Sequence, residues 1–350
     1  MITQRCVGIS YTLQCPLACD HCVTFSSPQT KERMTLEEAM GYIDELEGLV
    51  EHICFTGGEV FLHLPELIKL VDKATRQGHL VSAMTSAYWA TSDGITKKKI
   101  QSLMDVGLVE LGISLDRYHL DFIPEERALR AARMADSLGL EAAIRVVVGK
   151  DDDYDDYIKS LFVNSSVRVE SCPVVNLGRA SSKITRNEFF SLGLKQMHRC
   201  ETVRSADVLP NGKVTACCGP GMYMTDQNPL VLGNAKQEPL SEIIQRSWNN
   251  NIMKLINVSG PAGLQQQLDA ENLTTTLPQN YTDICALCLA ITNNPDSTTA
   301  LEKKLNSETT ITRLDAAVLL QEVHDINNSP FALPCCEKKP AETNQVKHQN

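Results

Sequence analysis

Three cysteines in one short loop constrain this chain more than any other feature of its sequence. Cys15, Cys19 and Cys22 follow the first strand-like run, Val7–Thr12. Three thiolates at this spacing can hold one corner of a cubane iron–sulfur cluster and leave the fourth iron without a protein ligand. That open iron predicts a site where the amino and carboxylate groups of S-adenosylmethionine (SAM) chelate. Zinc is the alternative metal, although zinc sites usually take four ligands in paired form.

Composition and charge exclude several classes of protein. The chain has 350 residues, 43% of them hydrophobic and 22% charged, so it can bury a large core. Its net charge of -10, without long basic runs, argues against a nucleic acid partner. The apolar stretch near the N-terminus is too short for a signal or membrane segment, so we expect no membrane partner and a cytoplasmic location. Thirteen cysteines at unequal spacing favour metal ligation over a disulfide framework.

The first half of the chain alternates short β-branched runs with longer amphipathic runs. This α/β pattern predicts six βα units, and active residues at strand C-terminal ends favour an open, partial (β/α)6 TIM-like barrel. The first helix has a capping box at Thr35 and Glu38, and the second has Pro65 in its first turn. The predicted strands are Val7–Thr12, His52–Thr56, Leu80–Thr85, Val109–Ser114, Glu141–Val148 and Val167–Val175.

The periodic pattern ends after Arg179, which divides the chain into three predicted parts. Residues 1–185 form the barrel, and residues 186–295 form a smaller cysteine-bearing domain with Gly and Pro turns. Residues 296–350 contain one helix, Thr310–Ile326, and a polar, solvated tail from Glu337 to Asn350.

A second set of cysteines lies in the smaller domain. Asn211-Gly212 predicts a tight hairpin that brings the first two of them together. Four thiolates can fully ligate a second, auxiliary [4Fe–4S] cluster, and a structural zinc is the alternative. The four are Cys200, Cys217, Cys285 and Cys288.

The other cysteines have different expected roles. Cys218 adjoins Cys217 and faces the opposite way on a strand, so it is not expected to ligate the same cluster. It is either a small buried hydrophobe or a thiol whose weak S–H bond quenches a carbon radical. Cys6, Cys54 and Cys172 lie in strand patterns and are expected in the core, while the Cys335-Cys336 pair lies near the tail.

Three motifs together resemble the radical SAM superfamily over roughly residues 5–180. They are CPLACDHC at residues 15–22, the segment Phe55–Glu59 after the second strand, and Ser114–Asp116 after the fourth. The resemblance implies that the backbone of Gly57 and Gly58 contacts the SAM amino group and that Glu59 is its carboxylate partner. Glycine suits this place because it lets backbone approach closely.

The same resemblance implies further SAM contacts. Thr85-Ser86-Ala87 resembles the third-strand TNG-like motif, with Ser86 as the polar contact, and Ser114 resembles the ribose contact. Gly178-Arg179-Ala180 resembles the segment beside the adenine, where Arg179 acts mainly through its backbone.

Two more positions carry open alternatives. Arg145, in the fifth strand, either donates to the SAM carboxylate or is a barrel arginine that extends toward solvent. Asp116, at the catalytic rim with Tyr118 and His119, either positions substrate and moves protons or caps the following turn. His21 occupies a position that is often aromatic in the family, where the ring packs near the adenine.

The second cysteine set resembles the SPASM and twitch auxiliary-cluster domains, and the absence of a longer cysteine series favours the twitch form. A closer resemblance to peptide epimerases of the epipeptide type comes from CDHC, FTGGEVFL, Ile113–His119 and Cys200–Cys218. It implies that a 5′-deoxyadenosyl radical takes a Cα hydrogen from a ribosomally made peptide, and that Cys218 returns a hydrogen from the other face.

Other functions share this scaffold. They include thioether or carbon–carbon cross-linking of peptides and dehydrogenation of a small molecule, neither of which needs Cys218 as a donor. Each would need an electron donor such as flavodoxin or ferredoxin. We expect no separate leader-binding domain before Val7, so a peptide would dock in the barrel or through a partner. A protein that only stores clusters would not cleave SAM.

Overall fold

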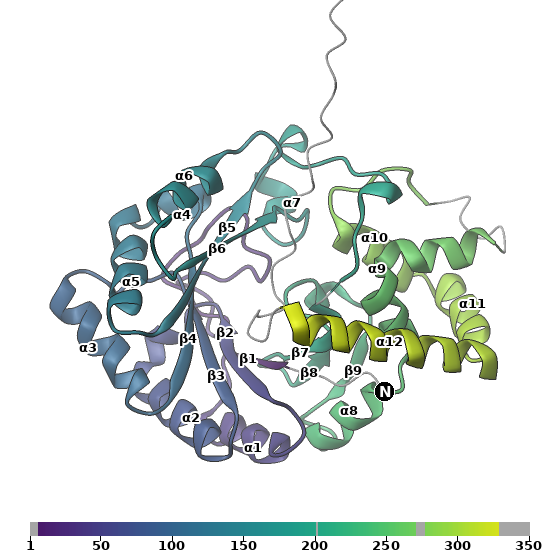
Figure 1. The fold of residues 1–350 in the computed structure, drawn as a ribbon, viewed down its shortest axis with the longest axis horizontal. Helices are drawn as coiled ribbons and strands as arrows, with labels where there is room; N and C mark the ends of the chain where they lie inside the picture. The colour runs from purple at the N-terminus through teal and green to yellow at the C-terminus, as the bar shows by residue number, and fades with distance from the viewer. Residues whose placement is uncertain (1–5, 201, 271–276, 329–350) are drawn as a thin grey trace, which may run out of the picture.

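The six predicted βα units form a curved parallel sheet in the computed structural model, which describes residues 6–200, 202–270 and 277–328. Each strand pairs in parallel with the next one along the chain. The prediction of a partial barrel is confirmed, and strand boundaries differ from the predicted ones by at most two residues (Figure 1). The strands are β1 (Cys6–Thr12), β2 (His52–Gly57), β3 (Leu80–Thr85), β4 (Leu108–Ser114), β5 (Glu141–Val148) and β6 (Arg168–Pro173).

Helices cover the outer face of this sheet (Figure 1). The predicted capping box at Thr35 and Glu38 starts α1, and Pro65 lies in the first turn of α2. Apolar side chains such as Ile43 and Leu70 pack fully buried against the strands, and each burial stabilises the fold by roughly 1.5–3 kcal/mol. The helices are α1 (Leu36–Leu46), α2 (Leu64–Arg76), α3 (Asp93–Met104), α4 (Arg117–Leu120), α5 (Glu125–Ser137), α6 (Tyr154–Leu161) and α7 (Ala180–Lys183).

The smaller half of the chain continues the barrel sheet, which the sequence did not reveal. Strands β7 (Ser205–Val208), β8 (Lys213–Thr215) and β9 (Val231–Asn234) extend it in the order β6-β5-β4-β3-β2-β1-β7-β8-β9. β7 pairs in parallel with β1, and the predicted hairpin at Gly212, whose φ is 87°, joins β7 to β8. The two halves therefore share one nine-stranded sheet.

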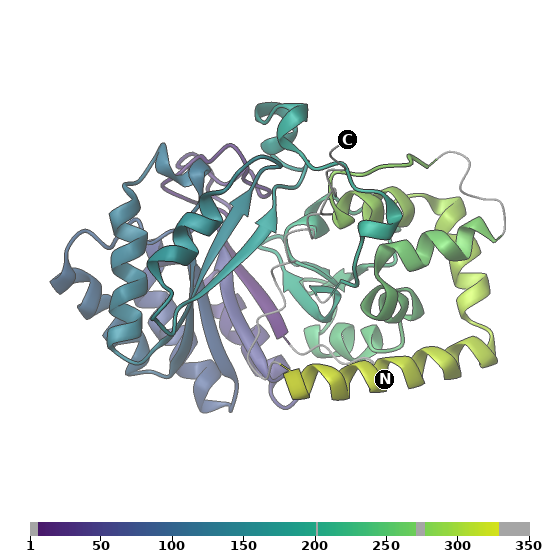
Figure 2. The same cartoon turned by 45° about the horizontal axis from the view of Figure 1, so that its top comes forward.

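A helical layer completes the smaller half (Figure 2). α9 kinks at Gly260 and Pro261, and the carbonyl of Ile256 accepts a hydrogen bond from the Cys200 N–H. Two buried cations attach α12 to this layer, because Arg204 pairs with Glu322 and Lys254 pairs with Asp315. The helices are α8 (Leu240–Ser247), α9 (Asn251–Asp269), α10 (Ile284–Thr292), α11 (Pro295–Leu305) and α12 (Glu308–Asn328).

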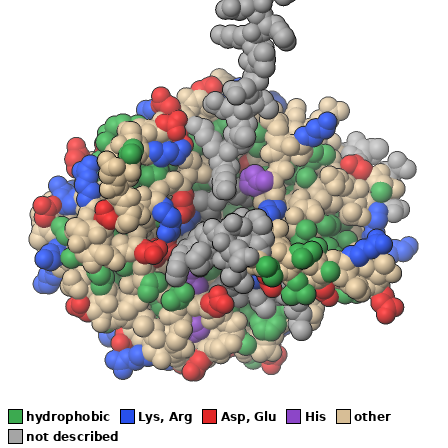
Figure 3. All heavy atoms as spheres, in the orientation of Figure 1, with side chains coloured by type: hydrophobic (Ala, Val, Ile, Leu, Met, Phe, Trp, Pro, Cys, Tyr) green, Lys and Arg blue, Asp and Glu red, His purple; other side chains and the backbone are tan. Residues whose placement is uncertain are grey.

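α12 confirms the predicted C-terminal helix, and the predicted tail with Cys335 and Cys336 lies outside the described residues. Hydrophobic side chains gather along α12 on the face shown in Figure 3, where Leu319, Leu320 and Val323 are 53%, 74% and 59% exposed. Among the described residues, no helix is both long and apolar enough to cross a bilayer.

Candidate active site and its two cysteine sites

The loop after β1 brings the first three cysteines together. The Cys22 N–H donates to the Cys19 carbonyl, and the Cys15 N–H donates to the Ser27 carbonyl, so the loop folds back on itself. Burial raises the pKa of the Cys15 thiol to about 12, with a smaller contribution from the neighbouring Glu59 and Cys22. Burial also raises the pKa of Cys19, and its neighbours include Cys15 and Cys22. Buried thiols this close become thiolates when a cation neutralises them, which fits a cluster held by these three residues.

Arg179 holds this loop in place. Its guanidinium donates to the Cys19 carbonyl at 2.6 Å and to the Ser26 carbonyl at 2.7 Å, while its backbone N–H donates to the Cys22 carbonyl. Gly178 adopts a φ of 60°, and a Cβ there would lie 2.4 Å from the Cys22 carbonyl oxygen. Arg179 therefore lies beside the first cysteine site. The prediction was of mainly backbone contacts to SAM, whereas the side chain of Arg179 contacts the cysteine loop.

The glycines after β2 allow two backbone segments to approach each other closely. Gly57 has a φ of 127°, and its missing Cβ would lie 2.1 Å from the Thr12 carbonyl oxygen. Gly58 donates its N–H to that carbonyl at 2.6 Å, and a Cβ on Gly58 would meet the Gln14 carbonyl. These glycines thus dock the β2 loop onto the start of the cysteine loop. Because an ammonium group donates hydrogen bonds, a contact from this loop to the SAM amino group would use its carbonyl oxygens.

Glu59 was predicted to be a carboxylate partner of SAM, and in the structure both of its oxygens already accept hydrogen bonds from the protein. Glu59 is fully buried, and one oxygen accepts from Thr85 Oγ1 and the Phe61 N–H. Its other oxygen accepts from the N–H and the Oγ of Ser86, at 2.9 and 2.6 Å. Burial raises the pKa of Glu59, while these hydrogen bonds favour its ionised form. Glu59 and Ser86 therefore tie β2 to β3 beneath the site, and the Ser86 hydroxyl is committed to Glu59.

Asp116 is a positioning residue in this structure and is not exposed to a substrate. It has no exposed surface, caps the Tyr118 N–H, and its Oδ1 lies 2.8 Å from His119 Nδ1. Its Oδ2 lies 3.5 Å from His21 Nε2. Burial opposes the charge on His119, but Asp116 outweighs this and raises the pKa of His119. The predicted cap is confirmed, and Asp116 also orients two imidazoles, while a role on substrate or in proton transfer stays a prediction.

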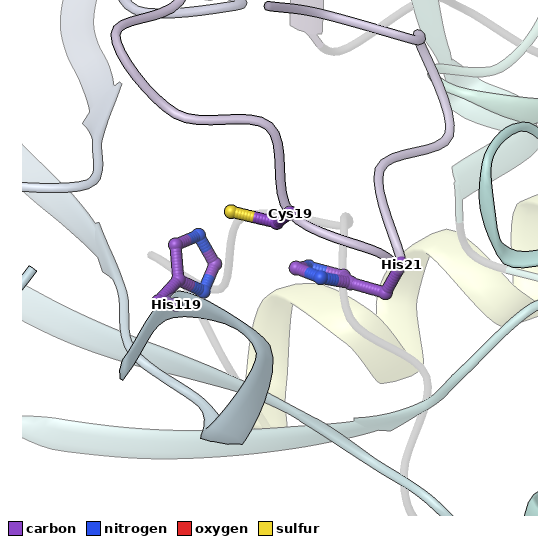
Figure 4. A group of neighbouring side chains, drawn as sticks. All are labelled: Cys19, His21 and His119. Carbon is purple, nitrogen blue, oxygen red and sulfur yellow. The ribbon is translucent and has the colours of Figure 1, made fainter. Parts of the chain in front are cut away.

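Those two imidazoles surround a cysteine of the first site (Figure 4). Ligand atoms of Cys19, His21 and His119 all lie within 4.8 Å of one another. The His21 ring stacks on Tyr118 with centroids 4.9 Å apart, and burial lowers the pKa of His21 to about 4. A neutral, stacked His21 fits the ring position predicted between Cys19 and Cys22. The sequence placed His119 at the catalytic rim but did not reveal its proximity to Cys19, because the two residues lie far apart in the chain.

Arg145 and Ser114 lie side by side on the neighbouring strands β5 and β4. Arg145 is 6% exposed and pairs with Glu170 on β6 at 3.2 Å. The solvent-reaching alternative for Arg145 is wrong, because its head group is buried in an ion pair inside the barrel. A contact with the SAM carboxylate stays a prediction, as does the ribose contact of Ser114.

The four cysteines of the second site line one cavity of about 960 Å³, its open mouth included. Cys285 and Cys288 lie one turn apart at the start of α10, whose cap Asp283 accepts from the Ala286 N–H. Burial raises the pKa of Cys217 far above its usual value, and the nearby Cys288 and Cys200 add to this effect. The clustered thiols fit the four-thiolate set that a cubane cluster requires.

The same cavity reaches the first site and holds two more thiols. His21 and Val23 of the cysteine loop line it, and so does Cys218. Cys172, at the end of β6, lines it as well and is partly exposed, so the prediction of a core role for Cys172 is wrong. Cys6 and Cys54 are buried together, as predicted.

Asp207 is a further buried acid that the sequence did not single out. It lies on β7 with 2% of its surface exposed, and both carboxylate oxygens accept from the Ser10 hydroxyl. Burial raises the pKa of Asp207 to about 7, against the opposing effect of Ser10. A Cβ on Gly8 would lie 2.8 Å from this carboxylate, so the glycine makes room for it.

Comparison with known proteins agrees with this arrangement of two sites. Residues 9–162 match the radical SAM superfamily, and residues 200–271 match the SPASM iron–sulfur cluster-binding domain. The chain thus combines a radical SAM core, a SPASM domain and a helical C-terminus, and the cofactors of these domains are SAM and [4Fe–4S] clusters. The match is to SPASM, whereas the cysteine count favoured the twitch form. Cys285 and Cys288 lie beyond the matched residues.

Among curated proteins, the chain is 23% identical over 312 residues to YydG of Bacillus subtilis (strain 168), which is named as a peptide biosynthesis protein. The alignment covers 83% of this chain and 93% of YydG.

Two solved structures have a similar fold. One is native anSMEcpe with bound AdoMet and the Cp18Cys peptide, at a TM-score of 0.51 and 14% identity, covering 90% of this chain and 99% of the other. Streptococcus suis SuiB bound to its precursor peptide SuiA gives a TM-score of 0.51 at 13% identity, covering 82% and 76%.

Proposed function

We propose that this chain modifies a ribosomally made peptide and that its reaction is the epimerisation of an L-residue to a D-residue. One observation carries the proposal: Cys218 lines the cavity that also reaches the SAM-cluster loop at His21 and Val23. A thiol in this place can meet a substrate radical formed beside the first site. The names of YydG and of the two peptide-bound structures support a peptide as substrate.

The residues divide the work between the two cysteine sites. Cys15, Cys19 and Cys22 would hold the first cluster, and Cys200, Cys217, Cys285 and Cys288 the second. When bound, the first cluster and SAM would supply a 5′-deoxyadenosyl radical, the chemistry needed to remove a Cα hydrogen from a peptide. Cys218 then gives its thiol hydrogen to the opposite face of the Cα. One C–H bond is lost and one is formed, and the Cys218 thiyl takes up one electron and one proton to become a thiol again.

The proposed reaction needs electrons one at a time, which a small carrier of the flavodoxin or ferredoxin type would supply. One electron starts SAM cleavage and another restores Cys218, so the peptide itself undergoes no net oxidation. Cross-linking or dehydrogenation would instead remove two hydrogens from the substrate.

The test uses anaerobic holoenzyme with SAM, a chemical reductant and random-sequence synthetic peptides in deuterated water. Because a thiol exchanges its hydrogen with solvent, epimerisation adds one deuterium to a Cα, which mass spectrometry and chiral amino-acid analysis detect. Cys218→Ala should still form 5′-deoxyadenosine but incorporate no deuterium, whereas Cys172→Ala, the matched thiol on the β6 side, should keep incorporating it. A product that has lost two hydrogens and gained no deuterium would contradict the proposal.

A further inference from the structure

The two edges of the nine-stranded sheet differ. At one edge, the Arg246 guanidinium donates to the outward carbonyl of Leu232 on β9 at 2.7 Å, and α8 packs beside it. The other edge is β6, which pairs only with β5 among the strands of the described residues. One edge is thus covered by a side chain and a helix, and no strand among the described residues pairs with the outer side of the other.

Printed backbone bonds fix which groups of β6 point away from the sheet. The Val174 N–H donates to Val148, so alternate residues of β6, the even-numbered ones, face β5. Leu115 donates to the Arg145 carbonyl, which shows that the odd-numbered residues of β5 face β4, as this pattern requires. The outward groups of β6 are therefore those of the odd-numbered residues, Val169, Ser171 and Pro173. Proline, which has no N–H, is tolerated in a sheet at such an outward position.

This edge runs into the cavity described above. Cys172 and Pro173 of β6 line it, and Cys218 lines it too. Residues 168–172 of β6 are all partly exposed, and none is fully accessible. A recessed edge of this kind admits a single extended chain more readily than the edge of another folded protein, and only a main chain offers amide groups at the matching spacing.

We propose that the peptide substrate binds as an added strand along the outer edge of β6, with its backbone paired to Val169 and Ser171. This inference rests on the proposed peptide substrate and adds how that substrate is recognised. Backbone pairing depends little on the side chains of the peptide. It also presents every second residue of the peptide to the inner face of the sheet, where Cys172 lies. The modified residue is then one of those inward residues.

A backbone scan of the peptide tests this on the unaltered holoenzyme. Peptides of the random-sequence mixture that immobilised holoenzyme retains are identified by mass spectrometry, and one is resynthesised with N-methyl groups at successive positions. Strand addition predicts that binding weakens about tenfold at every second position, since each methyl removes one hydrogen bond and blocks the close approach of the strands. Equal tolerance at all positions would overturn the inference.

The enzyme offers a matched pair of variants. Ser171→Pro removes the outward N–H, whereas Ser171→Ala keeps it and loses only the side-chain bond to Asp155. Ser171→Pro should weaken peptide binding about tenfold relative to Ser171→Ala, with SAM cleavage in the absence of peptide unchanged. Equal binding by the two variants would contradict strand addition.

Two results separate this inference from the proposed function. Alternating N-methyl sensitivity without deuterium uptake would support the docking mode and contradict epimerisation. Deuterium uptake with uniform N-methyl tolerance would support epimerisation and overturn the docking mode. A dimer whose formation removes peptide binding would show that a second copy occupies the edge, and would also overturn it.

Discussion

The two cysteine sites are built in opposite ways. The first takes its three thiols from eight consecutive residues, Cys15 to Cys22. Arg179 donates hydrogen bonds to this loop, and the Ser27 carbonyl accepts one from the Cys15 N–H. The second takes its four thiols from a loop, a strand end and a helix start, between Cys200 and Cys288. A local loop can be preformed before metal binds, whereas joining distant segments carries a larger loop-closure cost. Metal binding should therefore stabilise the second half of the fold more than the first.

Removing one thiol from each site gives the largest expected effects and tests whether the two sites differ in this way. Cys15→Ala should abolish SAM cleavage and leave thermal stability nearly unchanged. Cys217→Ala should keep SAM cleavage, lower the iron content and lower the melting temperature of the holoenzyme. Iron analysis, 5′-deoxyadenosine formation and calorimetry measure the three properties. If Cys217→Ala also abolished SAM cleavage, the two sites would not be independent.

The second prediction tests whether Arg179 holds the first site in its folded shape before metal binds. Arg179→Ala removes two donors from the carbonyls of Cys19 and Ser26, so SAM cleavage should fall about 10–100-fold, as for other residues that orient metal ligands. Arg179→Lys is the control, and it should recover only part of the loss because an ammonium lacks the planar fork of the guanidinium. Full activity of Arg179→Ala would mean that the loop holds its shape without this residue.

The third prediction concerns the strand that joins the two halves. Asp207 has a folded pKa of about 7, above its usual 3.8, so the folded chain keeps a proton that the unfolded chain loses. The contribution of Asp207 to stability is therefore greatest below about pH 4 and falls as the pH rises to about 7, by up to about 4 kcal/mol. Asp207→Asn cannot ionise and should remove this dependence, so it should match the parent near pH 4 and exceed it at pH 8. Urea unfolding of the cluster-free chain at both pH values measures the difference, and parallel pH profiles would contradict the assigned pKa.

The smallest expected effect lies away from both sites. Arg117 is 55% exposed and pairs with Asp152 and Asp153. Arg117→Ala should lower the free energy of unfolding by less than about 1 kcal/mol, because exposed ion pairs are screened by solvent. Chemical denaturation measures this free energy of unfolding, with which the other variants can be compared. A loss of several kcal/mol would show that the loop after β5 supports the barrel.

Local signals were enough to predict the barrel and the first cysteine site. Strand β3 has the bounds predicted for it, Leu80–Thr85, and the Thr35–Glu38 capping box marks the start of α1. These features depend on residues a few positions apart. The spacing of Cys15, Cys19 and Cys22 is equally local.

Contacts between distant segments could not be predicted. Ser10 and Asp207 are 197 residues apart, and nothing in either run indicates that β7 pairs with β1. Cys172 was assigned to the core because its strand looked buried, but β6 is an edge strand and its inner face borders the cavity. The sequence also does not reveal that Thr85 and Ser86 donate hydrogen bonds to the oxygens of Glu59.

The pairing of β7 with β1 has a mechanical consequence. Because β1 ends at the three-cysteine loop, and β7 leads through a hairpin to β8 just before Cys217, one hydrogen-bonded sheet connects the two cysteine sites. Separating the two sites at this point would require breaking the backbone hydrogen bonds between β1 and β7.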